Sequence, residues 1–196
     1  MTLHRLKLQT LAVAAALALG GLAMTGCTTT TANSEAAPHS AREGIDANVQ
    51  ATLSRLYNTV SDSRELVQKA AGVLVFPSVV GGSFVLGAEY GRGALLVGGR
   101  TAGYYSTTAG SIGLQAGGQS KAVIYVFNTR EALDKFRNSK GWTVGADATV
   151  TVATVGANAS VNNRTIQQPV VGYVLTNVGL EAGASVQGAK INRIEP

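Results

Sequence analysis

Short apolar runs separated by glycine fill the middle of the chain, residues 71–127, which read AGVLVFPSVVGGSFVLGAEYGRGALLVGGRTAGYYSTTAGSIGLQAGGQSKAVIYVF. Val, Ile, Phe and Tyr suit a pleated, half-buried surface, and glycine supplies the backbone conformations of tight turns. The pattern therefore predicts successive β-strands. We expect them at residues 73–76, 83–90, 94–97, 101–107, 111–116 and 121–127, with a hairpin turn at residues 91–93.

Two of these strands carry a signal about their place in the sheet. Pro77 lacks a backbone N–H, so we expect the first strand to end there or to lie at an edge. Residues 121–127, KAVIYVF, are apolar on both faces, which favours a central position.

Helical spacing replaces the strand pattern on both sides of this region. One apolar stripe recurs at the period of a helix before the strands: Ile45, Val49, Leu53, Leu56 and Val60. A second, short helix is expected at residues 62–71, with Ser61 or Asp62 as its N-cap and Gly72 ending it. A third is expected from the capping residues at 128–131 through Asn138, with Gly141 after it.

Apolar and polar residues alternate strictly from Trp142, which predicts one strand over residues 142–152 with one buried face. The phase changes after Ala153, which indicates a bulge or turn near residues 154–156, and a further turn is expected at 162–164. Three last strands are expected at 170–175, 180–186 and 190–194. The predicted fold is α+β and β-rich: an antiparallel sheet or barrel-like β domain with two N-terminal helices and one mid-chain helix.

The first 26 residues have a different pattern, a basic start, MTLHRLK, followed by the apolar run LQTLAVAAALALGGLA. This run is short and ends in small residues, as in a cleaved secretory signal rather than a membrane span. Thr25 and Gly26 directly before Cys27 resemble the lipobox of bacterial lipoproteins. The resemblance implies transfer of diacylglycerol to the Cys27 thiol, cleavage before it and acylation of the new terminus. The alternative is an ordinary signal with a stray cysteine, but Cys27 is the single cysteine, and lipidation accounts for it.

These patterns divide the chain into a lipoprotein signal peptide at 1–26, lipidated Cys27 with a flexible tether at 27–43, and one domain at 44–196. The tether assignment rests on the small polar composition of residues 28–43, TTTTANSEAAPHSARE. We expect a bacterial envelope location, with the acyl chains anchored in the outer membrane and the domain facing the periplasm or the cell surface.

Composition narrows the chemistry. The net charge of +5 is mild, and the tail and tether account for part of it, so nucleic-acid binding is not expected. Beyond the signal the chain keeps one histidine, His39, in the tether, which excludes a histidine triad or a multi-histidine metal site from the domain. Nucleotide-binding and hydrolase glycine motifs are missing from the sequence. We expect no metal, no cofactor and no catalysis.

One enzymatic alternative remains open, a pair of carboxylates drawn from Glu89, Asp147 and Glu181 acting on envelope glycan or lipid. The favoured interpretation is that each lies on a solvated strand face or pairs with a nearby base: Arg92, Arg100 or Lys121.

Basic residues of the N-terminal helical region are the other candidates: Arg42, Arg55, Arg64 and Lys69. Near anionic headgroups each basic side chain adds on the order of 1 kcal/mol of membrane affinity. The alternative is that they are solvated helix faces, with Glu65 and Lys69 paired across one helical turn.

An ordered series of segments resembles the SYLF domain, a lipid-binding domain of bacteria and of eukaryotic membrane-trafficking and actin-patch proteins. The segments are AAGVLVFP at 70–77, GGSFVLG at 81–87, GRGALLV at 91–97, SIGLQAG at 111–117, VIYVF at 123–127, TREALDKF at 129–136, and the positions around Tyr173, 179–183 and 186–188. The likeness runs from about residue 46 to the C-terminus. It implies phospholipid binding through the N-terminal amphipathic and basic segment, and phosphoinositide, the ligand of eukaryotic members, is not expected in a bacterial envelope.

Two stretches depart from the family pattern, at residues 104–107 and 173–176, where YYST and YVLT stand. We expect both to be loops with altered surface chemistry, and Tyr104, Tyr105 and Ser106 to be possible loop contacts with lipid. Taken together, the sequence predicts a lipid-anchored, non-catalytic domain that binds anionic phospholipid or a protein partner of the envelope.

Overall fold

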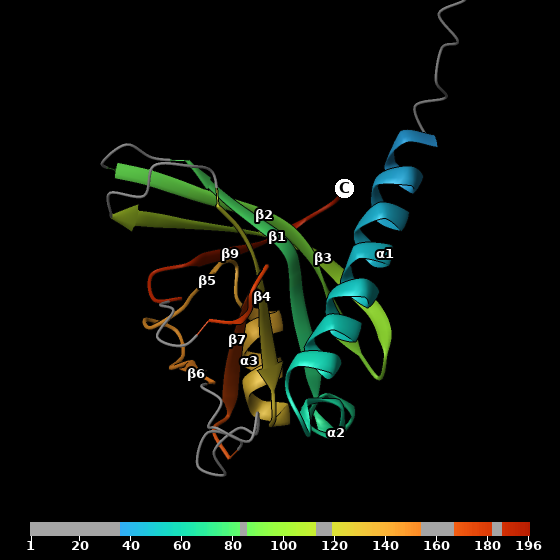
Figure 1. Cartoon of the computed structure of the whole chain (residues 1–196), viewed down its shortest axis with the longest axis vertical. Coiled ribbons are helices and arrows are strands. Elements are labelled where there is room, and N and C mark those ends of the chain that lie inside the picture. The colour runs from blue at the N-terminus through green and yellow to red at the C-terminus, as the bar shows by residue number, and fades with distance from the viewer. Residues whose placement is uncertain (1–35, 83–85, 113–118, 154–166, 182–185) are drawn as a thin grey trace, which may run out of the picture. The chain divides into compact units, whose positions relative to one another are not determined.

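A computed structural model gives the fold, and it describes residues 36–82, 86–112, 119–153, 167–181 and 186–196 (Figure 1). All of these lie in one compact unit, Ala32–Pro196. The signal peptide, Cys27 and the turns expected at 154–156 and 162–164 lie outside the described residues. The elements are α1 (Ala36–Thr59), α2 (Ser63–Lys69), β1 (Gly72–Gly82), β2 (Leu86–Val97), β3 (Arg100–Ile112), β4 (Gln119–Phe127), α3 (Arg130–Asn138), β5 (Trp142–Thr143), β6 (Thr151–Val152), β7 (Val170–Thr176), β8 (Gly179–Leu180) and β9 (Lys190–Ile194).

The strands form a single sheet in the order β5-β9-β3-β2-β1-β4-β7-β6, and β8 pairs with β7. Neighbouring strands are antiparallel except for the short parallel pair β6–β7. Figure 1 shows the sheet curling, with α1 and α2 on its outer side and α3 on its inner side. The expected α+β, β-rich class is confirmed, and so is the central position of β4, which lies between β1 and β7.

Strand alternation gives the sheet two buried faces. On β4, Ile124 and Val126 point to the outer side, where they pack with the α1 stripe, while Tyr125 and Phe127 point to the inner side. We call these two clusters the outer core and the inner core. The outer core is mainly aliphatic. The inner core holds most of the large rings, with centroids 5.0–6.3 Å apart: Phe76, Tyr105, Tyr125, Phe127, Phe136 and Trp142.

The glycines at 91–93 do not form the expected hairpin, because β2 runs straight through them. They face a register shift in β1 next to Pro77, which lies inside a central strand rather than at its end. A Cβ on Gly93 would lie 1.9 Å from the backbone oxygen of Val75, so only glycine permits this close approach. The actual turn between β2 and β3 is formed by Gly98 and Gly99, at φ of 56° and 77°.

Two other strand predictions were wrong in their limits. The strands expected at 101–107 and 111–116 are one strand through Ile112, β3. The strand expected over 142–152 breaks into β5 and β6 around a turn, where Thr143 N–H donates to Asp147 Oδ2 at 2.6 Å and Gly145 has φ of 92°. Apolar and polar residues still alternate in the sequence of this turn, so the alternation did not reveal the break in the strand.

The helices agree with the sequence in their buried faces and differ at their ends. All five residues of the α1 stripe are buried, but α1 begins at Ala36, so residues 36–43 are helix rather than flexible tether. Pro38 is compatible with this start because the first turn needs no intrahelical N–H bond. Asp62 occupies the N-cap of α2 as expected, though its side chain makes no capping bond and α2 ends at Lys69.

For α3 the prediction is confirmed: the Thr129 side chain accepts from Ala132 N–H, and Leu133 and Phe136 are buried.

Across the described parts of the chain, every helix is too short or too polar to cross a bilayer.

Candidate functional site

Arg42 binds the C-terminal end of the chain rather than facing outward. Its Nε donates to the Pro196 backbone oxygen at 3.2 Å, its Nη2 lies 3.5 Å from Glu195 Oε2, and its guanidinium lies 6.0 Å from the Tyr104 ring centroid. This side chain therefore joins α1 to the segment after β9.

Tyr104 completes the same junction from β3. Its hydroxyl donates to Asp46 Oδ2 at 2.9 Å, and the Thr101 hydroxyl donates to Asp46 Oδ1 at 2.9 Å. Partial burial, together with the bond to Asp46 and its charge, raises the pKa of Tyr104. We call Arg42, Asp46, Thr101 and Tyr104 the α1 clasp, because they fasten this helix to β3.

The expected loop at residues 104–107 is wrong, since these residues belong to β3. Tyr105 and Ser106 are only 6% and 8% exposed, and Tyr105 packs against Phe136 with ring centroids 5.0 Å apart. The second expected loop, at 173–176, lies in β7, where Tyr173 is fully buried in the outer core. The departures from the family pattern at these positions are therefore changes in buried or half-buried strand residues.

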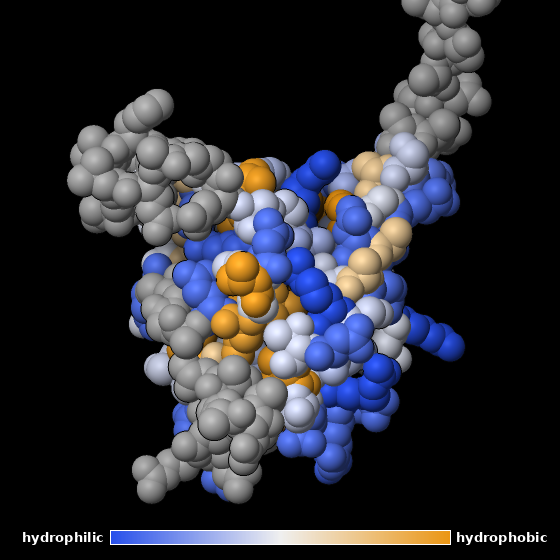
Figure 2. Space-filling view, viewed as in Figure 1, coloured by the Kyte–Doolittle hydropathy of each residue, from blue (hydrophilic) through white to orange (hydrophobic). Residues whose placement is uncertain are grey.

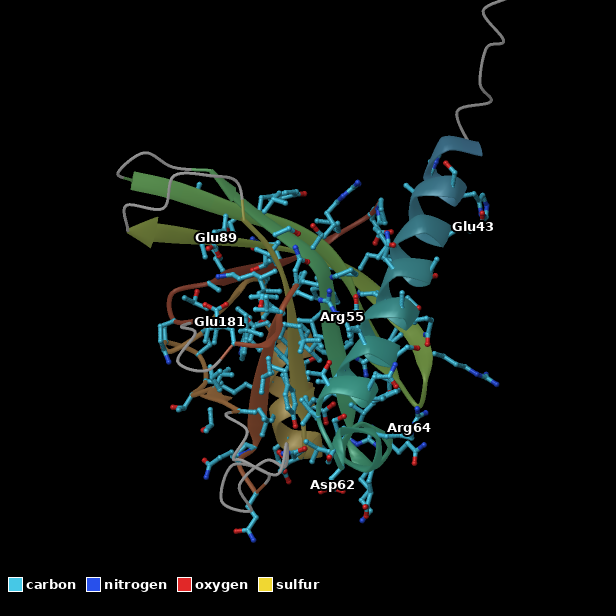
Figure 3. The ribbon with its side chains drawn as sticks, in the orientation of Figure 1. Glu43, Arg55, Asp62, Arg64, Glu89 and Glu181 are labelled. Carbon is cyan, nitrogen blue, oxygen red and sulfur yellow. The ribbon has the colours of Figure 1, made fainter. Side chains whose placement is uncertain are left out.

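Arg55 and Arg64 lie on exposed parts of the helical region (Figure 3). Arg55 borders a hollow of about 290 Å³ next to Pro77 and Ser78, and no ion pair to it occurs among the residues that the structure describes. The Arg64 guanidinium lies 4.4 Å from the Tyr57 ring centroid, a cation–π contact. Burial raises the pKa of the Tyr57 hydroxyl, and the Arg64 charge partly offsets this effect.

Lys69 pairs with Glu65 one helical turn away, as the alternative interpretation of these residues predicted. The hydrogen bond and the charge of Lys69 lower the pKa of Glu65. Both side chains are well exposed, so the pair contributes little to stability.

A cavity of about 430 Å³ lies between α1, α2 and the β2–β3 turn, and we call it the helix-pair cavity. Its lining includes the apolar residues Leu53, Val67, Val73 and Leu96 and the polar side chains Gln50, Tyr57 and Gln68. Three basic residues adjoin lining residues: Arg64 lies over Tyr57, Lys69 follows Gln68, and Arg100 follows Gly99. Figure 2 shows mostly hydrophilic side chains on the visible side of α1 and α2. The cavity therefore has a mixed polar and apolar lining, and three basic residues lie next to residues that line it.

The three candidate carboxylates lie on different elements and have structural partners or solvent. Glu89 on β2 pairs with Lys121 on β4 at 3.0 Å, which is one of the pairings weighed from the sequence. Asp147 holds the turn after β5, and Glu181 is exposed after β8 (Figure 3). The described residues contain no group of three or more metal-ligating side chains. These contacts favour structural roles for Glu89 and Asp147.

Neither the α1 clasp nor the helix-pair cavity was predictable from the sequence. The Arg42 contact joins residues 154 positions apart, and the Tyr104 contact joins residues 58 apart, so no local pattern encodes either one. The glycine pair at 98–99 was the one local mark of the turn beside the cavity.

Comparison with known families bears on the C-terminal part of the chain. Residues 108–195 match the family described as Ysc84: Las17-binding protein actin regulator, and they contain β4, α3, β7 and β9. The match covers somewhat less than half of the chain. No curated protein matches the chain. The match supports the SYLF-domain resemblance, and over residues 108–195 the chain is similar to the Ysc84 family.

Proposed function

We propose that this chain is a membrane-anchored lipoprotein whose SYLF-like domain binds anionic phospholipid through the exposed side of α1 and α2, without catalysing a reaction. The similarity to the Ysc84 family over residues 108–195 supports a lipid-binding domain type. Acylated Cys27 provides the anchor in this proposal, and the outer membrane is the expected location.

The observation that carries the lipid surface is the set of exposed basic side chains around the helix-pair cavity: Arg64, Lys69 and Arg100, with Arg55 further along α1. The α1 stripe faces the outer core, so the opposite side of the helix is free for contact. At about 1 kcal/mol for each basic side chain near an anionic surface, Arg55, Arg64 and Arg100 add about 3 kcal/mol. Lys69 adds less because Glu65 neutralises it locally. Arg42 is not counted in this sum because it already pairs with Glu195 and the Pro196 backbone oxygen.

The family description names a protein partner, Las17, and actin regulation. For this chain, the alternative is that a protein of the envelope, rather than phospholipid, binds the exposed basic side of α1 and α2. Acidic side chains on such a partner would meet the same basic residues, so a vesicle experiment separates the two occupants.

The test is co-sedimentation of residues 32–196, the compact unit that holds both cores, with vesicles of phosphatidylglycerol or of phosphatidylcholine alone. We expect binding to the anionic vesicles that weakens as salt rises. Replacing Arg55, Arg64 and Arg100 by Glu should abolish it. The matched control replaces Arg130, Lys190 and Arg193 by Glu, an equal charge change at exposed positions elsewhere, and should retain most binding. Equal loss in both triple variants, or no binding by the parent, would reject the surface.

The anchor is tested separately, in bacteria fed labelled palmitate. The wild-type chain should incorporate label and fractionate with membranes, whereas Cys27→Ser should do neither. If both chains fractionate with membranes but neither incorporates label, Cys27 is not lipidated. That outcome does not affect the lipid surface of the domain, which the vesicle experiment tests.

A further inference from the structure

A second cavity, of about 220 Å³, lies on the inner side of the sheet, opposite to the face that α1 covers. We call it the inner cavity. Its apolar walls include Val79, Val123 and Val186, and three of its lining side chains are polar and ionisable: Glu89, Lys121 and Tyr125. Neither the family resemblance nor the proposed lipid surface assigns a role to these residues.

The Glu89–Lys121 pair is built across a strand. Glu89 on β2 has Gly81 on β1 as its direct neighbour, and a Cβ on Gly81 would lie 3.0 Å from Glu89 Cγ. The missing side chain at Gly81 lets Glu89 lie across β1 and reach Lys121 on β4, where Oε1 and Nζ are 3.0 Å apart. The two side chains are 19% and 22% exposed, so both charges are largely removed from bulk water.

The pair leaves hydrogen-bonding capacity unused. An ammonium group has three donors and a carboxylate accepts several bonds, yet within the described parts of the chain the bond between Glu89 and Lys121 is the one that each side chain makes. Burying charge is costly unless the remaining donors and acceptors also find partners. Both residues also line the inner cavity, so a molecule there lies within reach of their charged groups.

Tyr125 adds a buried donor to the same cavity. The residue is 1% exposed, and its ring packs edge-on against Phe76 and Trp142. Its side chain is among those that line the inner cavity. Burial first, and then the negative charge of Glu89, raise the pKa of Tyr125, so the hydroxyl keeps its proton and acts as a donor.

We propose that the inner cavity binds a small zwitterion, a molecule of about amino-acid size that carries an ammonium group close to a carboxylate or phosphate. The anionic group accepts from Lys121 Nζ and the Tyr125 hydroxyl, the ammonium group donates to Glu89, and an apolar substituent contacts the valine walls. A singly charged ligand fits less well, because the lining pair is neutral overall and one partner would face a like charge. The volume is below the roughly 300–1,000 Å³ of sites for larger ligands.

This inference does not depend on the proposed lipid surface, because the two sites share no side chain and lie on opposite faces of the sheet. The same ligand chemistry has two sources, a free amino acid and the ethanolamine phosphate group of a phospholipid. The experiment uses both as probes, L-valine and glycerophosphoethanolamine, and compares them with isovalerate and isobutylamine, which are valine without its ammonium group and without its carboxylate.

Isothermal titration is performed on the full chain in micelles of an uncharged maltoside detergent. We expect L-valine or glycerophosphoethanolamine to bind, and each singly charged analogue to bind at least tenfold more weakly. Whichever zwitterion binds identifies the source. If neither zwitterion gives measurable heat, and neither displaces the other from the protein, the proposal is overturned.

Tyr125→Phe keeps the ring and removes the donor, and it should weaken zwitterion binding about tenfold or more because a hydrogen bond to a charged group is lost. Glu89→Gln should weaken it similarly. Arg130→Glu, on the exposed start of α3, is the control and should leave the affinity unchanged. Unchanged affinity in Tyr125→Phe and Glu89→Gln would show that the zwitterion binds elsewhere and would overturn the proposal. The fluorescence of Trp142, the single tryptophan, verifies that each variant keeps the inner core.

Discussion

The two faces of the sheet are built from alternate residues of the same strands, yet they differ in kind. Ile124 and Val126 of β4 face α1 in an aliphatic cluster, while Tyr125 and Phe127 face α3 and Trp142 in an aromatic one. Each face borders a cavity, and the two cavities differ in charge. The helix-pair cavity on the outer side is lined by uncharged residues, whereas the inner cavity is lined by the largely buried pair of Glu89 and Lys121.

This difference separates two kinds of chemistry. The helix that closes the outer core presents solvated basic side chains, whose attraction to anionic surfaces is long-ranged and sensitive to salt. The charges on the inner side are few, largely buried and held at a fixed distance, so they favour a ligand of defined size and charge pattern.

The largest effect is expected where one substitution disrupts both faces. In Gly93→Ala the new Cβ would meet the Val75 backbone oxygen at 1.9 Å, which requires β1 and β2 to separate in the centre of the sheet. We expect a loss of more than about 4 kcal/mol in the free energy of unfolding by urea. The control is Gly110→Ala on β3, where a Cβ has no atom within 4 Å and little change should follow. Equal urea-unfolding midpoints for the two variants would mean that β1 and β2 do not approach each other closely at Gly93.

The two glycines also show what the sequence could and could not reveal. The α1 stripe, the α3 cap and the central β4 strand were predictable because each depends on a local period or a local hydrogen bond. Whether a glycine forms a turn or permits close approach depends on the neighbouring strand, so the role of Gly93 next to the Pro77 register shift was not readable. Gly98 and Gly99, which form the actual turn, cannot be told from the glycines at 91–93 by residue type alone.

The candidate sites divide in the same way. Lys69 with Glu65 was predictable from spacing along one helix, and Lys121 was among the partners weighed for Glu89. That Glu89 reaches across β1 over Gly81 depends on strand order and register, which the sequence pattern did not specify. Arg42 contacts the C-terminal segment, 154 positions away, and no sequence motif indicates that contact.

Matched deletions in the two cores should distinguish the faces spectroscopically. Phe136→Ala removes a ring from the inner core at 5.4 Å from the Trp142 ring centroid, and about 3–5 kcal/mol of stability should be lost. Leu56→Ala in the outer core, also fully buried, should cost about 2–5 kcal/mol. Trp142 fluorescence under native conditions should shift only in Phe136→Ala. A similar shift in Leu56→Ala would show that the two cores are not separate layers.

Alkaline pH should weaken both faces through their buried tyrosines. Burial raises the pKa of Tyr173, in the outer core, to about 12, against about 10 for an unfolded tyrosine. The neutral form is favoured in the folded state, so this contribution is fully present below pH 10 and is lost as the pH rises through about 12. The difference corresponds to about 3 kcal/mol. Urea unfolding at pH 9 and pH 11.5 measures it, and Tyr173→Phe should flatten this part of the profile. An identical slope in Tyr173→Phe would assign the alkaline loss to other groups.

The smallest expected change in the free energy of unfolding has opposite signs at two tyrosines. One contacts α1, and the other is buried in the outer core. The Tyr173 hydroxyl is buried without a hydrogen-bond partner among the described residues, so Tyr173→Phe removes an unpaired polar group and should stabilise the protein by about 1 kcal/mol at pH 7. Tyr104 donates to Asp46 in the α1 clasp, so Tyr104→Phe should destabilise it by about 1 kcal/mol. Urea midpoints for both variants decide the sign. Stabilisation by Tyr104→Phe would mean that the clasp does not fasten α1, and destabilisation by Tyr173→Phe would mean that its hydroxyl is bonded in solution.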